Sequence, residues 1–262
     1  MPERVSSGRY RARVEYDGTD FAGFQVNPGK RTVQGVLEDS LARLGNGAGE
    51  RIDGAGRTDA GVHATGQVIA FSYDGRLTVS ELGRALDALL PPDVTIREVR
   101  AVSLTFHPRY AARYREYRYT VWNGPRSPLR ERTALGVRIP LDTAAMARVG
   151  SVFIGRHDFG TFGVTDHSAV RTVMAVRVRT EGRVVTIDIR AESFLRGMAR
   201  RMVACLLEVG LGKMDEEAVR SALAGPGPAL GGTSAPAKGL CLRHVAFWRR
   251  SVGDMNGAHE ER

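Results

Sequence analysis

Hydrophobic and polar residues alternate along several segments with the period of two that is typical of β-strands. The first such segment, residues 9–16, places Arg11 and Arg13 between apolar residues and ends at the turn residues Asp17 and Gly18. The same pattern predicts strands over residues 67–73, 94–102, 116–122, 171–179, 184–191 and 240–248. A short Glu-Gly turn separates the fourth and fifth of these, so we expect that pair to form a hairpin.

Between these segments, apolar residues recur every three or four positions, which is the spacing of one face of an α-helix. Residues that cap helices precede four such stretches: Thr32, Thr78, Asp142 and Asp215. The second stretch also carries a glutamate three residues after its cap, as in a capping box. A longer, mostly apolar stretch predicts a further helix over residues 194–209.

Strands and helices mix in two halves of similar length, with a boundary near residues 104–112. This organisation predicts an α+β protein made of two similar antiparallel-sheet units, each with helices on one face, and an active-site cleft between them. We expect the first unit over residues 9–104 and the second over residues 105–250. Short tails, residues 1–8 and 251–262, flank the two units.

Composition places the chain among globular proteins. Of its 262 residues, 42% are hydrophobic and 26% are charged, and charged residues interrupt every apolar run before it reaches the length of a membrane span. The first residues lack the apolar segment of a secretory signal. Cys205 and Cys241 are the only cysteines, which favours neither a disulfide framework nor a zinc site. These features predict a protein of the reducing cytoplasm.

The formal charge of +9 favours a polyanionic partner, because basic side chains that neutralise phosphates release counterions. Only three of the 38 basic residues are lysine, and heavy use of arginine also follows from a GC-rich genome. Charge alone therefore indicates nucleic acid only weakly.

The densest group of chemically capable residues is the segment 54–64, where small residues surround Arg57 and Asp59. Glycines allow sharp turns and close approach of a ligand to the backbone. In an extended segment Arg57 and Asp59 point the same way, and an arginine beside a carboxylate favours its ionised form. An ionised carboxylate is a suitable nucleophile toward a sugar or a pyrimidine ring. The alternative is a structural turn closed by an Asp–Arg pair.

The segment Gly56-Arg57-Thr58-Asp59-Ala60-Gly61-Val62-His63-Ala64 resembles the signature of the TruA-type tRNA pseudouridine synthases. Further blocks resemble that family in the same order along the chain: Tyr16-Asp17-Gly18-Thr19, Thr32-Val33-Gln34-Gly35, Phe106-His107-Pro108-Arg109, Tyr117, His157-Asp158-Phe159, Ser193-Phe194-Leu195 with Arg200, and Gly239-Leu240-Cys241-Leu242. The resemblance extends over residues 9–248.

The resemblance implies an enzyme that isomerises uridine to pseudouridine at positions 38, 39 and 40 of the tRNA anticodon stem-loop. It implies a homodimer that uses no metal and no cofactor. Asp59 corresponds to the nucleophile, which attacks either ribose C1′ or the uracil ring. Arg57 and Arg200 orient Asp59 or hold RNA phosphate. Tyr117 stacks on the target base and assists removal of the C5 proton. An aromatic face compensates for the stacking that the base loses when it is flipped out of the RNA helix.

Several neighbouring residues have two interpretations. Tyr117 is either at the site or an ordinary core residue of a strand. Arg115 and Arg118 favour RNA contact beside it, and Arg113 does so more weakly. Arg196 lies one helical turn before Arg200, so the two predict a basic ridge.

The histidines of the resembling blocks, His63, His107 and His157, are expected to be hydrogen-bonded structural residues rather than catalytic ones. Asp17 is expected to be a turn residue and Asp158 a cap.

Two positions depart from the family pattern: Asn27, where a second glutamine is common, and Ala199, where a bulkier aliphatic residue usually precedes the arginine. Gly197, in the same predicted helix, is expected to weaken a helix interior.

Two other functions fit the same composition. A pair of RNA-recognition-like sheets could bind structured RNA without chemistry, although an acidic residue such as Asp59 does not help RNA binding. A metal-dependent hydrolase could use Asp59 and His63, although the spacing of the acidic residues matches no metal signature.

Overall fold

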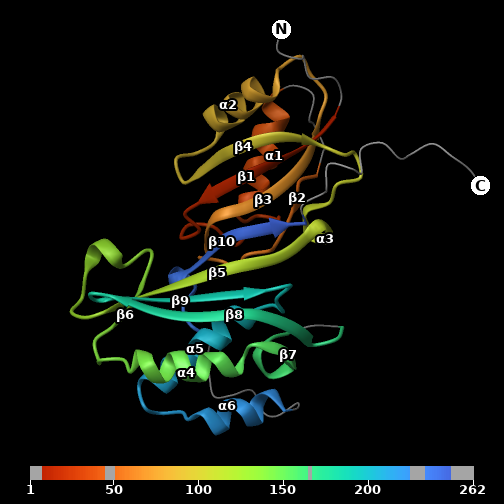
Figure 1. Cartoon of the computed structure of the whole chain (residues 1–262). Helices are drawn as coiled ribbons and strands as arrows, with labels where there is room; N and C mark the ends of the chain where they lie inside the picture. The colour runs from red at the N-terminus through yellow and green to blue at the C-terminus, as the bar shows by residue number, and fades with distance from the viewer. Residues whose placement is uncertain (1–7, 45–50, 165–166, 225–233, 249–262) are drawn as a thin grey trace, which may run out of the picture.

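The computed structural model describes residues 8–44, 51–164, 167–224 and 234–248. Its centre is a ten-stranded mixed sheet with the strand order β4-β1-β3-β10-β5-β9-β8-β7; β2 pairs with β3, and β6 pairs with β5 (Figure 1). The strands are β1 (Gly8–Tyr16), β2 (Asp53–Gly54), β3 (His63–Tyr73), β4 (Val94–Val102), β5 (Ala112–Asn123), β6 (Leu135–Val137), β7 (Gly155–Asp158), β8 (Val170–Glu181), β9 (Val184–Ala191) and β10 (Leu240–Phe247). The helices are α1 (Val33–Arg43), α2 (Val79–Leu89), α3 (Pro108–Ala111), α4 (Thr143–Val152), α5 (Met198–Gly210) and α6 (Glu216–Leu223).

The N-terminal part packs α1 and α2 against β1, β3 and β4. Alternate residues of β1, from Tyr10 to Tyr16, are buried, as the sequence pattern predicts. The Thr32 side chain caps α1 by accepting the Gly35 N–H, and Thr78 caps α2 with the full capping box. Apolar side chains of both helices meet Ile69 and Ile96 of the sheet.

In the C-terminal part, α4 packs against β8, and α5 and α6 pack against α4. The Asp142 and Asp215 side chains cap α4 and α6 as predicted. Gly150 of α4 lies against Val176 of β8 closely enough that an added Cβ would be 3.0 Å from that side chain. The predicted hairpin is present as β8 and β9.

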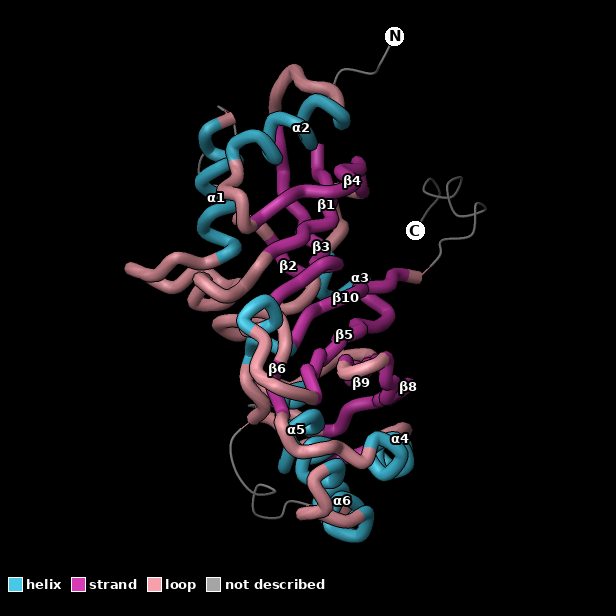
Figure 2. The backbone as a smooth tube through the Cα atoms, turned by 90° about the vertical axis from the view of Figure 1, so that its left-hand side faces the viewer, coloured by secondary structure: helices cyan, strands magenta, loops and turns pink. Residues whose placement is uncertain are grey.

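Strand β10 joins the two parts into one sheet. It pairs antiparallel with β5 and parallel with β3, and Figures 1 and 2 show it between those strands. The predicted α+β class is confirmed. The sheet is mixed rather than purely antiparallel, because β10 runs in the same direction as β3 and the short strand β6 runs in the same direction as β5.

Paired residues of neighbouring strands share one face of a sheet. Leu242 pairs with Ala64 on one side and with Tyr117 on the other, and Tyr117 in turn pairs with Ile189. One apolar row therefore crosses the junction of the two parts, and Tyr117 lies in it.

The helix predicted over residues 194–209 is shorter at its N-terminus. Helix α5 begins at Met198, and Gly197 precedes it with φ +76°, a left-handed conformation that glycine adopts without strain. The expectation that Gly197 weakens a helix interior is wrong, because the residue forms the turn before the helix. Arg196 therefore does not share a helical face with Arg200, and the predicted basic ridge is absent.

No helix in the described ranges combines the length and apolarity required to cross a bilayer.

Candidate active site

Asp59 lies in the loop of residues 55–62 between β2 and β3, at the junction of the two parts of the sheet. Its side chain is 37% exposed, so the carboxylate is open to solvent rather than enclosed in the core. Oδ2 of Asp59 lies 3.2 Å from a terminal nitrogen of Arg200 in α5. The loop that carries the acid thus comes from the N-terminal part, and its basic partner comes from the C-terminal part.

Close backbone packing fixes the shape of this loop. Gly18 lies against Val62 so closely that an added Cβ would be 1.9 Å from the Val62 carbonyl oxygen. Gly61 has φ +77°, which favours glycine. The buried Tyr16 hydroxyl is hydrogen-bonded to Thr58 at 2.8 Å. These contacts place Asp59 without involving its side chain.

Arg200 holds Asp59 from a fixed position. Its Nε donates to the Ala235 carbonyl at 2.7 Å, and the Ala235 N–H donates back to the Arg200 carbonyl at 3.1 Å. The guanidinium therefore cannot rotate freely, and its remaining nitrogen is directed at one oxygen of Asp59. The other oxygen, Oδ1, accepts no hydrogen bond from the described residues, so it is free to meet a ligand.

Tyr117 lies beside this ion pair in β5. Its residue is only 8% exposed, and its ring contacts Phe194 edge-on with a centroid distance of 5.0 Å. Burial raises the pKa of the Tyr117 hydroxyl, and the charge of Asp59 adds to that effect. The Tyr117 ring is therefore packed in the core, and its hydroxyl has no hydrogen-bond partner among the described residues.

Arg57 is not brought together with Asp59. Its side chain is exposed and forms no hydrogen bond or ion pair within the described part of the chain. The arginine that accompanies Asp59 is Arg200, which lies 141 residues away in the sequence.

Arg115 corrects the expectation of an RNA contact beside Tyr117. The residue is only 8% exposed, and its guanidinium donates to the backbone carbonyls of Ala55, Glu192 and Arg109. Burial lowers the pKa of Arg115. One buried cation thus ties the start of the Asp59 loop to the segment that carries Phe194. The clue in the sequence was its position two residues before Tyr117, on the buried face of the strand.

The other arginines near Tyr117 have different roles. Arg118 points to the opposite face of β5 and forms a bidentate pair with Asp188 at 2.7 and 2.9 Å, which corrects the expectation that it contacts RNA. Arg113 stacks over the Trp248 ring at 4.6 Å from its centroid. Arg196 is exposed in the turn before α5.

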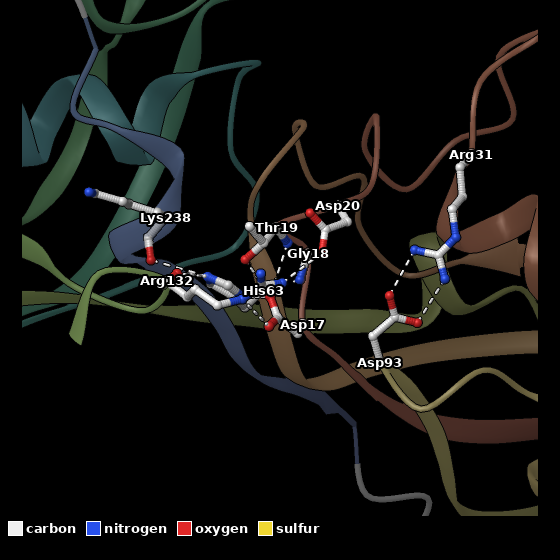
Figure 3. A network of polar contacts seen from close by, with 9 residues as sticks. All are labelled: Asp17, Gly18, Thr19, Asp20, Arg31, His63, Asp93, Arg132 and Lys238. Atoms are coloured by element: carbon white, nitrogen blue, oxygen red, sulfur yellow. Dashed lines mark hydrogen bonds and ion pairs between the residues drawn. The ribbon is translucent and has the colours of Figure 1, made fainter. Parts of the chain in front are cut away.

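His63, at the other end of the loop, is a hydrogen-bonded structural residue, as predicted (Figure 3). Its Nδ1 accepts the Gly18 N–H at 3.1 Å, and its Nε2 lies 3.0 and 3.1 Å from the carbonyls of Arg132 and Lys238. The Arg132 side chain extends the network by pairing with Asp17 and Asp20. Both ring nitrogens of His63 are therefore engaged.

The remaining sequence candidates are also structural. Asp17 accepts hydrogen bonds from the backbone and side chain of Thr19, which is the turn role predicted for it. His107 caps α3, and His157 is hydrogen-bonded to the Ile154 carbonyl. Asp158 accepts the Gly160 N–H at the start of a 3₁₀ turn. Within the described ranges, no three His, Cys, Asp or Glu side chains lie close enough to share a metal ion.

Comparison with known proteins gives a consistent result. Residues 12–111 and 151–247 match a family model described as tRNA pseudouridine synthase. The chain is 41% identical over 238 residues to the tRNA pseudouridine synthase A of Geobacter sulfurreducens, covering 89% of this chain and 97% of that protein. It is 40% identical over 243 residues to the corresponding protein of Brevibacillus brevis, covering 91% and 99%. A solved archaeal box H/ACA Nop10–Cbf5 complex matches at 13% identity, with a TM-score of 0.31 and coverage of 76% of this chain and 42% of that one.

Proposed function

Because the chain belongs to the family of tRNA pseudouridine synthases, which are isomerases, we propose that it forms pseudouridine at positions 38, 39 and 40 of the anticodon stem-loop with Asp59 as nucleophile. The observation that carries this proposal is the half-exposed Asp59 carboxylate, which is held through one oxygen by Arg200 and is free at the other.

The reaction balances without a co-reactant. The bond from ribose C1′ to N1 breaks, the uracil turns, and a bond from C1′ to C5 forms. C5 loses a proton and N1 gains one. If Asp59 attacks C1′, an Asp59–ribose ester forms as uracil leaves with the N1 electron pair, and C5 then displaces the carboxylate. If Asp59 attacks the ring, the ester forms at C6 and is released when C1′ has moved. Both routes need an ionised carboxylate with a free oxygen.

In this proposal Arg200 is a positioning residue that also stabilises charge. Its ion pair holds one oxygen of Asp59, and its second bond, to the Ala235 carbonyl, keeps the pair aligned. When the carboxylate is consumed in a covalent bond, the guanidinium is released to face a phosphate or the departing uracil. Arg57, which is exposed and has no ion pair within the described part of the chain, is assigned to RNA phosphate.

Tyr117 is assigned to the target base. An extruded uracil loses its stacking in the helix, and an aromatic side chain replaces about 1–3 kcal/mol of it per base. The free hydroxyl near Asp59 supports a second role, contact with the ring edge where the C5 proton leaves. The raised pKa of Tyr117 means that the free protein presents a phenol rather than a phenolate there.

The decisive experiment incubates purified protein with unmodified tRNA in EDTA and maps pseudouridine by position. We expect product at positions 38, 39 and 40, and none in a tRNA that carries cytidine at those positions. Absence of pseudouridine from the anticodon arm would overturn the proposed positions. Product that appears only with added divalent metal would overturn the metal-free mechanism.

The proposal includes a homodimer acting in the cytoplasm. The dimer is proposed from the family resemblance alone, and one tRNA is large enough relative to this chain to contact two subunits. Sedimentation at micromolar concentration is expected to give twice the mass of the chain, and a monomer that is fully active would contradict it.

A further inference from the structure

A pocket of about 180 Å³ opens beside the connection between β5 and β6, outside the site described above. Its lining is dominated by charged and aromatic side chains: Trp122, Arg126, Arg130, Glu131, Arg138 and Lys238. We call it the arginine pocket. Three of its four cations come from a stretch of thirteen residues, 126–138, so the local sequence concentrates positive charge at this place.

The protein neutralises only part of the positive charge of the arginine pocket. Glu131 lies in its lining, pairs with Lys238 and also attracts Arg126. Arg126, Arg130 and Arg138 form no ion pair with an acid in the described ranges, and all three are exposed. The remaining like charges repel one another, so an anion that bridges the arginines relieves the arrangement. Arginine presents a planar fork of donors that suits phosphate oxygens.

One wall of the pocket is fixed in place. The Trp122 indole N–H donates to the Pro125 carbonyl at 2.6 Å, which orients the ring. The Arg130 guanidinium lies over that ring, 5.6 Å from its centroid. A guanidinium held over an aromatic face loses less side-chain freedom when it binds a ligand, because part of its position is already set.

The arginine pocket is joined to the Asp59 loop by the segment of residues 235–238. At one end of this segment, the Ala235 carbonyl accepts from Arg200, the partner of Asp59. At the other end, Lys238 reaches into the pocket with its side chain, while its carbonyl bonds His63 (Figure 3). A polyanion that lies along this segment would contact both the Asp59 loop and the arginine pocket. The hydrogen bonds of residues 235–238 fix the spacing between the two.

We propose that the arginine pocket binds the phosphate backbone of the substrate tRNA at a point separate from the target uridine. This inference rests on the proposed function. It assigns to the β5–β6 connection the role of a second anchor, which supplies affinity and register and takes no part in the reaction itself. Phosphate contacts of this kind position a nucleic acid without reading its bases.

The test replaces Arg126, Arg130 and Arg138 together with glutamine. We expect tRNA affinity to fall about 10- to 100-fold, and the slope of log affinity against log salt to decrease by roughly 0.7–0.9 per lost contact. The turnover number at saturating tRNA should stay within about twofold of wild type, because no reacting atom is touched. All three side chains are exposed, so the thermal midpoint serves as the check on folding.

Two matched variants give the test its specificity. Glutamine at Arg76, Arg84 and Arg148, which are exposed and form no ion pair with an acid within the described part of the chain, removes the same charge elsewhere and should leave the salt slope close to wild type. The variant R126K/R130K/R138K keeps the charge and should recover most of the affinity.

The outcomes separate the two proposals. A wild-type protein that makes no pseudouridine overturns the proposed function, whereas the binding measurements still judge the pocket. Wild-type turnover together with equal tRNA affinity in the two glutamine triples overturns the pocket. A lysine triple as weak as the glutamine triple overturns the assignment to phosphate charge.

Discussion

Asp59, in the middle of the loop that carries the site, and His63, directly after that loop, are only four residues apart, yet their side chains have different surroundings. Asp59 is 37% exposed and has one ion pair, which leaves one of its oxygens free. His63 is 7% exposed, and both of its nitrogens are engaged by the surrounding chain. The difference teaches that a polar side chain whose hydrogen-bonding atoms all have partners in the protein stabilises the fold. A side chain that keeps an unpartnered, exposed atom is available to bind a ligand.

Replacing Asp59 is expected to give the largest effect on turnover and almost none on folding. Asp59→Asn should lower turnover on the order of 10⁴-fold or more, because the amide lacks nucleophilic charge, while tRNA affinity stays close to wild type. Single-turnover assays with saturating enzyme measure it. Asp59→Ala should behave alike, and near-wild-type turnover in either variant would mean that the acid is misassigned.

Arg115, like His63, is a buried side chain that is hydrogen-bonded to backbone carbonyls, so its replacement should lower the stability of the fold. Arg115→Met removes the donor from the buried Ala55 carbonyl and from the part-buried carbonyls of Glu192 and Arg109, and it should lower the free energy of unfolding by about 3–5 kcal/mol. Denaturant titration measures it. Arg118→Met is the matched control, since Arg118 is more exposed and Asp188 keeps its pair with Arg179. Equal losses in the two variants would remove the distinction.

Tyr117→Phe tests the unpartnered hydroxyl next to the acid. Because the ring and its packing remain, we expect KM to change little and kcat to fall about 10²-fold, the size typical of a lost proton-transfer group. Steady-state kinetics separates the two constants. Unchanged turnover would exclude a proton-transfer role and leave stacking alone.

Arg200 combines a structural role with a role at the site, since its guanidinium donates both to the Ala235 carbonyl and to Asp59. Arg200→Met should lower kcat about 10- to 100-fold through loss of alignment and charge. Arg200→Lys should recover part of the rate, because it restores the charge without the second bond. Single-turnover assays on the two variants provide the specific readout, with the thermal midpoint as the check on folding. Equal rates in Arg200→Met and Arg200→Lys would reduce Arg200 to a packing role.

The smallest expected effect concerns Asp17 in the His63 network. Burial alone raises the pKa of Asp17, but hydrogen bonds from Thr19 and Arg132 lower it below its ordinary value of 3.8. The ionised form therefore favours the folded state. Its contribution is present above that value and is lost as pH falls through the folded pKa.

Because Asp17 is 36% exposed, this contribution should be less than about 1 kcal/mol. Thermal midpoints measured between pH 5 and pH 2 should decline less steeply for Asp17→Asn than for wild type. The exposed Asp74→Asn variant serves as the control, and identical slopes in all three proteins would contradict the assignment.

The local sequence pattern predicted the main helices and strands well, because helix caps and hydrophobic periodicity depend on residues that are close together in the sequence. Thr78 with Glu81 gave the capping box, and alternation gave β1 and the hairpin of β8 and β9. The start of α5 was missed, since a glycine inside an apolar stretch resembles a weak helix residue. Only its positive φ reveals that Gly197 is the turn before the helix.

Resemblance identified Asp59 and Arg200, whose contact joins residues 141 positions apart and leaves no local signal. Charge misled the interpretation of Arg115, because basic residues near a site suggest nucleic acid. The burial of Arg115 follows from the face of β5 on which it lies, and the alternating pattern of the strand already indicated that face. The parallel pairing of β10 with β3 could not be predicted, since nothing near either strand specifies which distant segment lies beside it.

The position of β10 has a consequence for how the molecule comes together during synthesis. Every other strand of the sheet precedes β10 in the chain, and β10 is the one that bonds both β3 and β5. The two parts can collapse as they emerge from the ribosome, but the seam between them stays open until residues 240–247 arrive. The segment of residues 235–238, which holds Arg200 and His63 in register, arrives at the same moment. Assembly of the enzyme and completion of its active surface are thus a single late event.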